Sequence, residues 1–313
     1  MVRFIVRRVL SGVVLLFAIT TLAFLLLYAG GGDIARRIVG QTATAEQVAA
    51  RAAQLGLDKP IMEQYVAWLG NALTGNLGRS WFTGQLVLDG VTSRLAVTLS
   101  LVIGATIISA LLAVVLGVWA ALARGVVDRV IQFLTVLGMA IPGFLVAVGL
   151  VIVFALQLGW FRATGFTPFT QDPGGWVRSA TLPIVALAVG GVSAATQQIR
   201  GSVIDALQRD YVRTLRSRGL DTRSVVFKHV LRNSIGPALA ILNVQFVGML
   251  GGAVIVEQVF ALPGLGQLSV AATLQGDIPI VMGLVLATAA IVIFVNLAID
   301  LAQALLNPKV RLS

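Results

Sequence analysis

The densest group of charged side chains in the sequence lies within residues 205–232. Its basic members are Arg209, Arg213, Arg216, Arg218, Arg223, Lys228 and Arg232. The apolar segments on either side, residues 182–199 and 235–256, carry no charged residue at all. A basic loop between two apolar segments favours docking of a partner, which can be a protein or a layer of anionic lipid headgroups.

Other residue types limit the chemistry that this chain can perform alone. The sequence contains no Cys, which excludes disulfides, thiolate nucleophiles and thiolate metal sites. Its single His, His229, cannot form a histidine cluster, and we expect it to pack or cap rather than act as a ligand or acid–base group. The sequence lacks a Walker loop, GxSxG and HExxH. Any nucleotide chemistry must therefore come from a partner, and we predict no catalytic residue, metal or cofactor in this chain.

A second group consists of polar side chains within apolar segments. Its members are Asn243, Gln245, Glu257, Asn296 and Asp300. Such side chains either bond to neighbouring helices or line a path through the membrane. Glu257, at the outer end of its segment, can meet a substrate amine or be an ordinary interfacial acid. Asp300, near an inner end, can serve the path or pair with an Arg.

The composition requires a membrane. The chain is 58% hydrophobic and only 12% charged, with a mean hydropathy of +0.94. Apolar runs of about 20 residues cross a bilayer as helices. We predict an all-α polytopic protein with six spans, at residues 9–29, 96–123, 130–158, 182–199, 235–256 and 278–305. The expected parts are an N-terminal helix (1–29), an extracytoplasmic domain (30–95), a five-helix core (96–306) with the loop 205–232, and a cytoplasmic tail (307–313).

Charge distribution orients these spans. Arg3, Arg7 and Arg8 precede the first span, and the short outer loops hold only Arg162 and Arg178 of the 23 Lys and Arg residues. Because basic residues concentrate in cytoplasmic loops, we place both termini in the cytoplasm. The net charge of +10 then reflects topology rather than nucleic-acid binding. The alternative for the first 30 residues is a cleaved signal peptide, although the apolar stretch is long for one.

Local signals predict helices in two polar regions. In residues 30–95, Thr44 and Gln47 form a capping box, Gly56 ends that helix, and Pro60 lies near the first turn of the next. The alternative is a mere long loop. In the basic loop, we expect one helix to end before Gly219 and a second to begin at Asp221.

We expect the second helix to end near Leu231, with Gly236-Pro237 marking entry into the following span. Two angled helices would then form the basic loop. Composition alone leaves a solvated loop that contacts lipid headgroups as the competing interpretation.

Several motifs resemble the dipeptide/oligopeptide/nickel permeases of ABC importers. The matching segments are Tyr211–Leu220, Lys228–Asn233, Leu55–Pro60, Gly75–Ser80, Ala140–Phe144, Leu262–Gly266 and Leu306–Arg311. The chain departs from the family pattern at residues 29–33, at Leu86-Val87, and at Arg232, where many relatives have Pro.

This resemblance implies one half of a translocation pore in a bacterial inner membrane, with the type I importer fold. The implied partners are a second permease, ATP-binding subunits that hold ATP-Mg, an extracytoplasmic binding protein and membrane lipid. Peptides are the expected substrate; alternatives are a nickel chelate, heme or a sugar, or a stand-alone secondary transporter. The implied ATPase-coupling residues are Arg213, Arg216, Arg218, Gly219, Leu220, Asp221, Phe227, Lys228 and His229.

Overall fold

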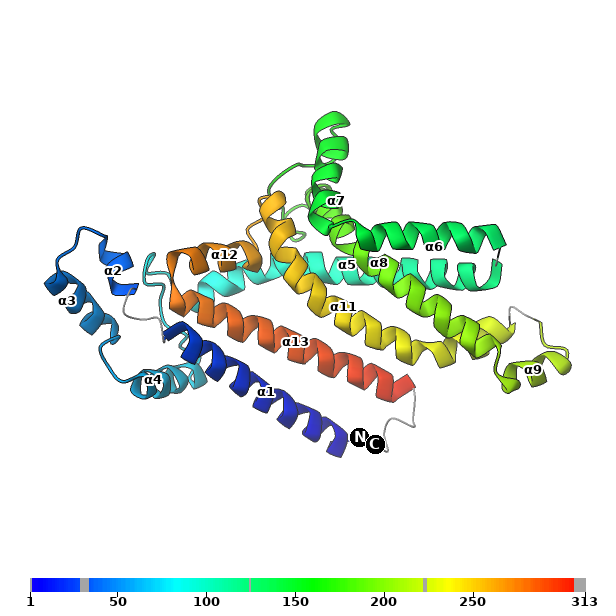
Figure 1. The fold of residues 1–313 in the computed structure, drawn as a ribbon, viewed down its shortest axis with the longest axis horizontal. Coiled ribbons are helices and arrows are strands. Elements are labelled where there is room, and N and C mark those ends of the chain that lie inside the picture. Colours follow the sequence, from blue (N-terminus) through cyan, green and yellow to red (C-terminus); the bar gives the residue numbers. More distant parts are fainter. Residues whose placement is uncertain (1, 29–33, 124, 222–223, 307–313) are drawn as a thin grey trace. The chain divides into compact units, whose positions relative to one another are not determined.

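The structure is a computed structural model in which the chain folds into helices that form two compact units (Figure 1). It describes residues 2–28, 34–123, 125–221 and 224–306, except for the side chains of residues 2, 232–235, 237 and 306. The first unit contains residues 1–96 and 264–294, and the second contains residues 97–263 and 295–313.

The first unit contains the predicted extracytoplasmic segment. Its helices are α1 (Val2–Tyr28), α2 (Ile34–Val39), α3 (Ala45–Leu55), α4 (Ile61–Leu73), the start of α5 (Val87–Ala123), α12 (Leu265–Gln275) and most of α13 (Ile278–Leu306). The capping box is confirmed, since Thr44 and Gln47 bond reciprocally at the start of α3. Gly56 ends α3 with a φ of 68°, as predicted. Pro60 occupies the N-cap of α4, just before the helical residues.

Aromatic side chains fasten α4 to the end of α1. Phe24 is fully buried and contacts the rings of Tyr65 and Trp68. The hydroxyls of Thr21 and Tyr65 are hydrogen-bonded at 2.6 Å. The face of α4 that carries Tyr65 and Trp68 is therefore the face that packs on α1.

A buried carboxylate holds the loop that precedes α5. Asp277, which is 3% exposed, accepts hydrogen bonds from the Ser80 hydroxyl and from the Trp81 backbone amide. The same hydroxyl accepts bonds from the amides of Phe82 and Thr83. This arrangement fixes the turn around Ser80 to the start of α13, and Asp277 was not among the residues predicted from the sequence.

The second unit contains the rest of α5 and the helices that carry the candidate site. These are α6 (Gly125–Ala140), α7 (Gly143–Leu150), the π-helix η2 (Val151–Gln157), α8 (Pro173–Leu207), α9 (Asp210–Ser217), the π-helix η3 (Val225–Val230) and α11 (Leu231–Val259). Helix α8 is central and contacts α6, α7 and α11. Gly117 allows α5 to approach it closely, because a Cβ at that position would lie 3.0 Å from the Thr196 carbonyl oxygen.

The described part of the chain has five helices long and apolar enough to cross a membrane, or six spans if one bent pair counts as a span. That pair corrects the expectation of an uninterrupted span over residues 130–158. Helix α6 and the α7–η2 segment meet at an angle of 97°. Pro142 stands at the break, and it has no N–H to donate to the carbonyl of Gly138. The all-α polytopic class is confirmed.

Candidate coupling and translocation site

The basic loop is a folded platform attached to the second unit by an apolar core. Val212 of α9 and Val225, Val226 and Val230 of η3 are all fully buried. They pack in one cluster with residues of α5 and α8, among them Val203. Leu220, between the two elements, is half-buried against the same cluster. A loop that only contacted lipid headgroups would need no such core.

Helix α9 ends as the sequence predicts. Gly219 has a φ of 80°, and no atom lies within 4 Å of where its Cβ would be. The strain at this position therefore comes from the left-handed backbone alone, which side chains other than glycine rarely adopt. After the turn, the amide of Val225 donates to the Asp221 carbonyl, as expected of a helix that follows Asp221.

The second predicted helix does not end at Leu231. Helix η3 continues without a break into α11, which runs to Val259. Gly236 lies inside α11 and does not take a positive φ. The left-handed glycine conformation that ends α9 at Gly219 is therefore not present at Gly236. The loop is therefore joined to the following span by a continuous helical segment.

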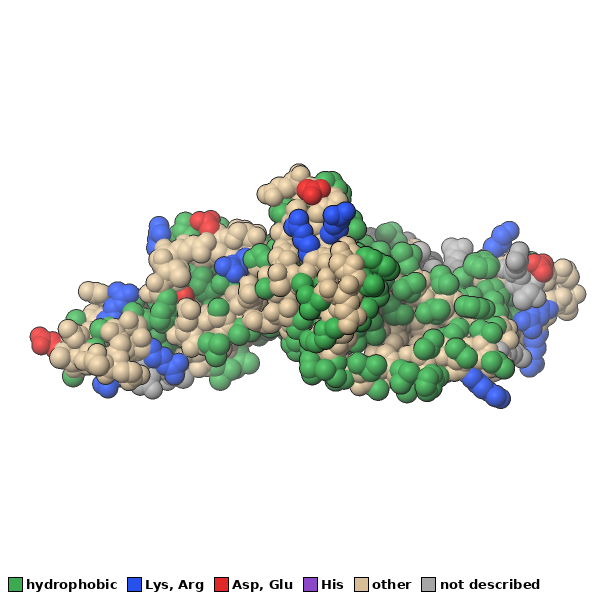
Figure 2. Space-filling model, turned by 90° about the horizontal axis from the view of Figure 1, so that it is seen from above, with side chains coloured by type: hydrophobic (Ala, Val, Ile, Leu, Met, Phe, Trp, Pro, Cys, Tyr) green, Lys and Arg blue, Asp and Glu red, His purple; other side chains and the backbone are tan. Residues whose placement is uncertain are grey.

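Charged and aromatic side chains cover the outside of this platform. Five of the residues that the family resemblance implies for coupling are exposed, and we call them the docking surface for that expected role: Arg213, Arg216, Arg218, Phe227 and Lys228. Figure 2 shows Lys and Arg side chains gathered at the end that carries α9. The Arg213–Asp210 contact, at 3.6 Å between highly exposed groups, contributes little. Asp221 is exposed, and His229 is half-buried on η3.

An apolar groove lies at the break between α6 and α7. It has a volume of about 480 Å³ and is walled by these two helices, α8 and α11. Gly190 and Gly191 line it from α8, and Gly248 and Gly252 line it from α11. Gln245 also lines it, and this is the only predicted pathway residue that does.

The other predicted pathway residues lie elsewhere. Glu257 is fully buried and accepts a 2.6 Å hydrogen bond from the Thr98 hydroxyl, so it belongs to the packing of α11 against α5. Asn243, Asn296 and Asp300 are half-buried but do not line the groove. The Oδ1 atoms of Asn243 and Asn296 are buried without a hydrogen-bond partner among the described residues.

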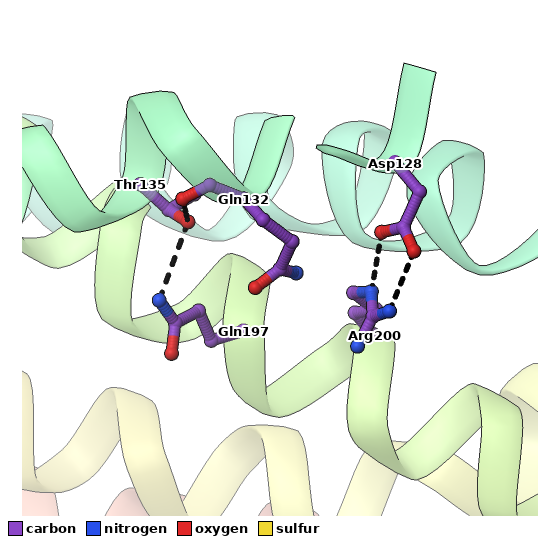
Figure 3. Close-up of polar contacts among 5 residues, drawn as sticks. All are labelled: Asp128, Gln132, Thr135, Gln197 and Arg200. Carbon is purple, nitrogen blue, oxygen red and sulfur yellow. Dashed lines mark hydrogen bonds and ion pairs between the residues drawn. The ribbon is translucent and has the colours of Figure 1, made fainter. Parts of the chain in front are cut away.

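Polar side chains join α6 to α8 along a seam that was not predicted from the sequence. Asp128 and Arg200 form a bidentate ion pair with two 2.6 Å bonds, and Gln197 donates to the Thr135 hydroxyl at 3.3 Å (Figure 3). Gln132 projects from α6 between these contacts. The sequence feature that indicates this seam is the helical spacing, which places residues 128, 132 and 135 on one face of α6.

The Asp128–Arg200 ion pair lies close to α9 of the platform. A pocket of about 400 Å³ is lined by both Asp128 and Arg200 and also by Arg216 of α9. Leu207 and Gln208, at the end of α8, also line this pocket. The second unit thus brings the platform and the α6–α8 seam together, although 72 residues separate the two partners of the ion pair.

Comparisons with known proteins cover nearly the whole chain. Residues 113–312 match the family described as "Binding-protein-dependent transport system inner membrane component". Residues 1–102 match the family described as "Binding-prot-dependent transport system membrane comp, N-term".

Curated relatives match end to end. A putative peptide transport system permease protein of Brucella abortus is 36% identical over 312 residues, which is 99% of each chain. The glutathione transport system permease protein GsiC of Escherichia coli is 33% identical, again over 99% of each chain. Among solved structures, a chain from the MetNI methionine ABC transporter in inward-facing conformations gives a TM-score of 0.53 at 17% identity. That match covers 69% of this chain and 97% of the other, and it supports the fold alone.

Proposed function

The chain belongs to the family of binding-protein-dependent transport system inner membrane components, and from that premise we propose that it forms half of the pore of an ATP-driven peptide importer. Its relatives of equal length are named as permeases for peptides and for glutathione, itself a small peptide. The proposed partners are a second permease, ATP-binding subunits and an extracytoplasmic binding protein. Hydrolysis of ATP-Mg is assigned to the ATP-binding subunits and not to this chain.

The observation that carries this proposal is the continuity between the platform and the groove. Helix α8 leads into α9 through only Gln208 and Arg209, and η3 leads directly into α11. Both α8 and α11 also form walls of the groove. A partner that binds the docking surface and moves would therefore move two groove walls, which is the coupling that an ATP-driven pore requires.

Reconstitution tests the proposed function. The chain is combined with a candidate second permease, ATPase and binding protein in liposomes, and uptake of a labelled dipeptide is measured. We expect uptake that requires both ATP and the binding protein, with hydrolysis stimulated by the peptide. Uptake of a nickel chelate, heme or a sugar instead would replace the substrate class. Uptake by this chain alone, driven by a proton or sodium gradient, would identify a secondary transporter.

Single cysteines test the proposed inner-membrane topology with both termini in the cytoplasm, because the chain has no Cys of its own. Ala53→Cys places a thiol on an exposed position of α3, and Ser217→Cys places one on an exposed position of α9. We expect an impermeant thiol reagent to label residue 53 in intact cells, and residue 217 only after the membrane is opened. The opposite labelling pattern would contradict this orientation.

A further inference from the structure

We propose that the side-chain amide of Gln245 recognises the peptide bond of a substrate in the groove. This rests on the proposed function and adds a recognition chemistry to it. Among all residues that line the groove, Gln245 alone has a polar side chain; the others are Gly, Ala, Pro, Val, Leu, Ile, Met and Phe. Any directional contact from a side chain in this groove therefore comes from Gln245.

The amide of Gln245 has unused hydrogen-bonding capacity. Both its Oε1 and its Nε2 are buried, and neither has a hydrogen-bond partner among the described residues. A buried amide without partners is unfavourable compared with the same amide in water. A substrate that offers one donor and one acceptor would remove this deficit, so binding would be favoured at this point of the groove.

A peptide bond has the required donor and acceptor. The carboxamide of Gln carries an acceptor oxygen and a donor NH₂, and a peptide unit carries a donor N–H and an acceptor C=O. Such pairing does not depend on the substrate's side chains, and the apolar walls add no polar preference of their own. The groove would thus select for a peptide backbone while it tolerates varied sequences.

The glycines of α8 shape the space around this amide. A Cβ on Gly191 would lie 2.3 Å from the Cε of Met249, 2.8 Å from the Oγ of Ser109 and 3.2 Å from the Oε1 of Gln245. The absence of a side chain therefore lets several side chains, the amide among them, approach the backbone of α8. At the neighbouring Gly190, no atom lies within 4 Å of a Cβ position. The groove volume of about 480 Å³ falls in the range of about 300–1,000 Å³ that is usual for small-ligand sites.

A nearly isosteric substitution tests this inference. Gln245→Met keeps the side-chain length but removes both hydrogen-bonding atoms, and Gln258→Met makes the same change at an exposed position of α11 outside the groove. At equal amounts of assembled complex and saturating binding protein, we expect Gln245→Met to lower dipeptide uptake at least tenfold. Gln258→Met should transport normally.

Disulfide trapping tests contact directly. With Gln245→Cys, a dipeptide whose cysteine carries a 2-thiopyridyl disulfide should be trapped during turnover by thiol–disulfide exchange, which releases 2-thiopyridone. Val247→Cys, which is exposed and lies outside the groove, should trap none. Full uptake by Gln245→Met, or no trapping at residue 245, would overturn the inference about Gln245. Peptide uptake by the wild-type complex in the same experiment would still support the proposed function. Loss of the second permease from the Gln245→Met complex would also overturn it, because the amide would then serve subunit pairing. Failure of the wild-type complex to import any peptide would instead refute the proposed function.

Discussion

Phe227→Ser is expected to abolish ATP-driven uptake while the chain itself stays folded. Phe227 is 63% exposed on η3, so its loss removes little packing within the chain. An aromatic side chain surrounded by basic residues on a docking surface has the character of an interface hot spot, whose truncation typically costs about 2–4 kcal/mol of binding free energy. That loss corresponds to roughly thirtyfold to a thousandfold in affinity. Co-purification of the ATP-binding subunits with the permease measures it.

The neighbouring residue supplies the matched control. Val226 is fully buried in the apolar core of the platform, so Val226→Ser should loosen the platform and lower the thermal stability of the purified chain. Phe227→Ser should leave that stability unchanged and affect only the association with ATP-binding subunits. Normal association and uptake by Phe227→Ser would show that the ATPase does not dock on this face of η3.

Features set by nearby residues could be predicted from the sequence. The Thr44–Gln47 capping box, the end of α3 at Gly56 and the end of α9 at Gly219 each depend on backbone and side-chain groups within a few residues. Spans could be found because hydrophobicity over about 20 residues determines them. The platform's location followed from its charge and motif, and the structure adds the buried valines that hold it.

Features set by distant contacts could not be predicted. The partners of Asp128 and Asp277 lie on other elements, and the helical pattern of one element does not identify the neighbouring helix. From the sequence, Glu257 was expected either to meet a substrate amine or to be an interfacial acid. Its burial against Thr98 depends instead on the position of α5 beside α11. Likewise, the sequence predicted an uninterrupted span over residues 130–158, because hydrophobicity along one segment does not reveal the angle of 97° at which α6 and the α7–η2 segment meet, with α7 packed against α8.

Separate replacement of Asp128 and Arg200 by Leu should sharply reduce the amount of assembled transporter and its uptake. Their side chains are 19% and 27% exposed, respectively. Removal of either partner leaves the other charge unpaired at the α6–α8 seam. We expect a cost between the about 0–1 kcal/mol of an exposed pair and the about 3–5 kcal/mol of a fully buried one.

Two double variants separate the charge from the packing. Replacement of both residues by Leu removes the unpaired charge, so the yield of complex should recover substantially over either single variant. Exchange of the two residues, as Asp128→Arg with Arg200→Asp, retains an ion pair, and it should restore yield if the pair is needed only to join α6 to α8. Yield is measured by purification, and uptake is compared at equal complex amounts. Wild-type yield and uptake in both single variants would show that solvent screens this pair, and the seam would then rest on Gln197, Thr135 and the surrounding apolar contacts.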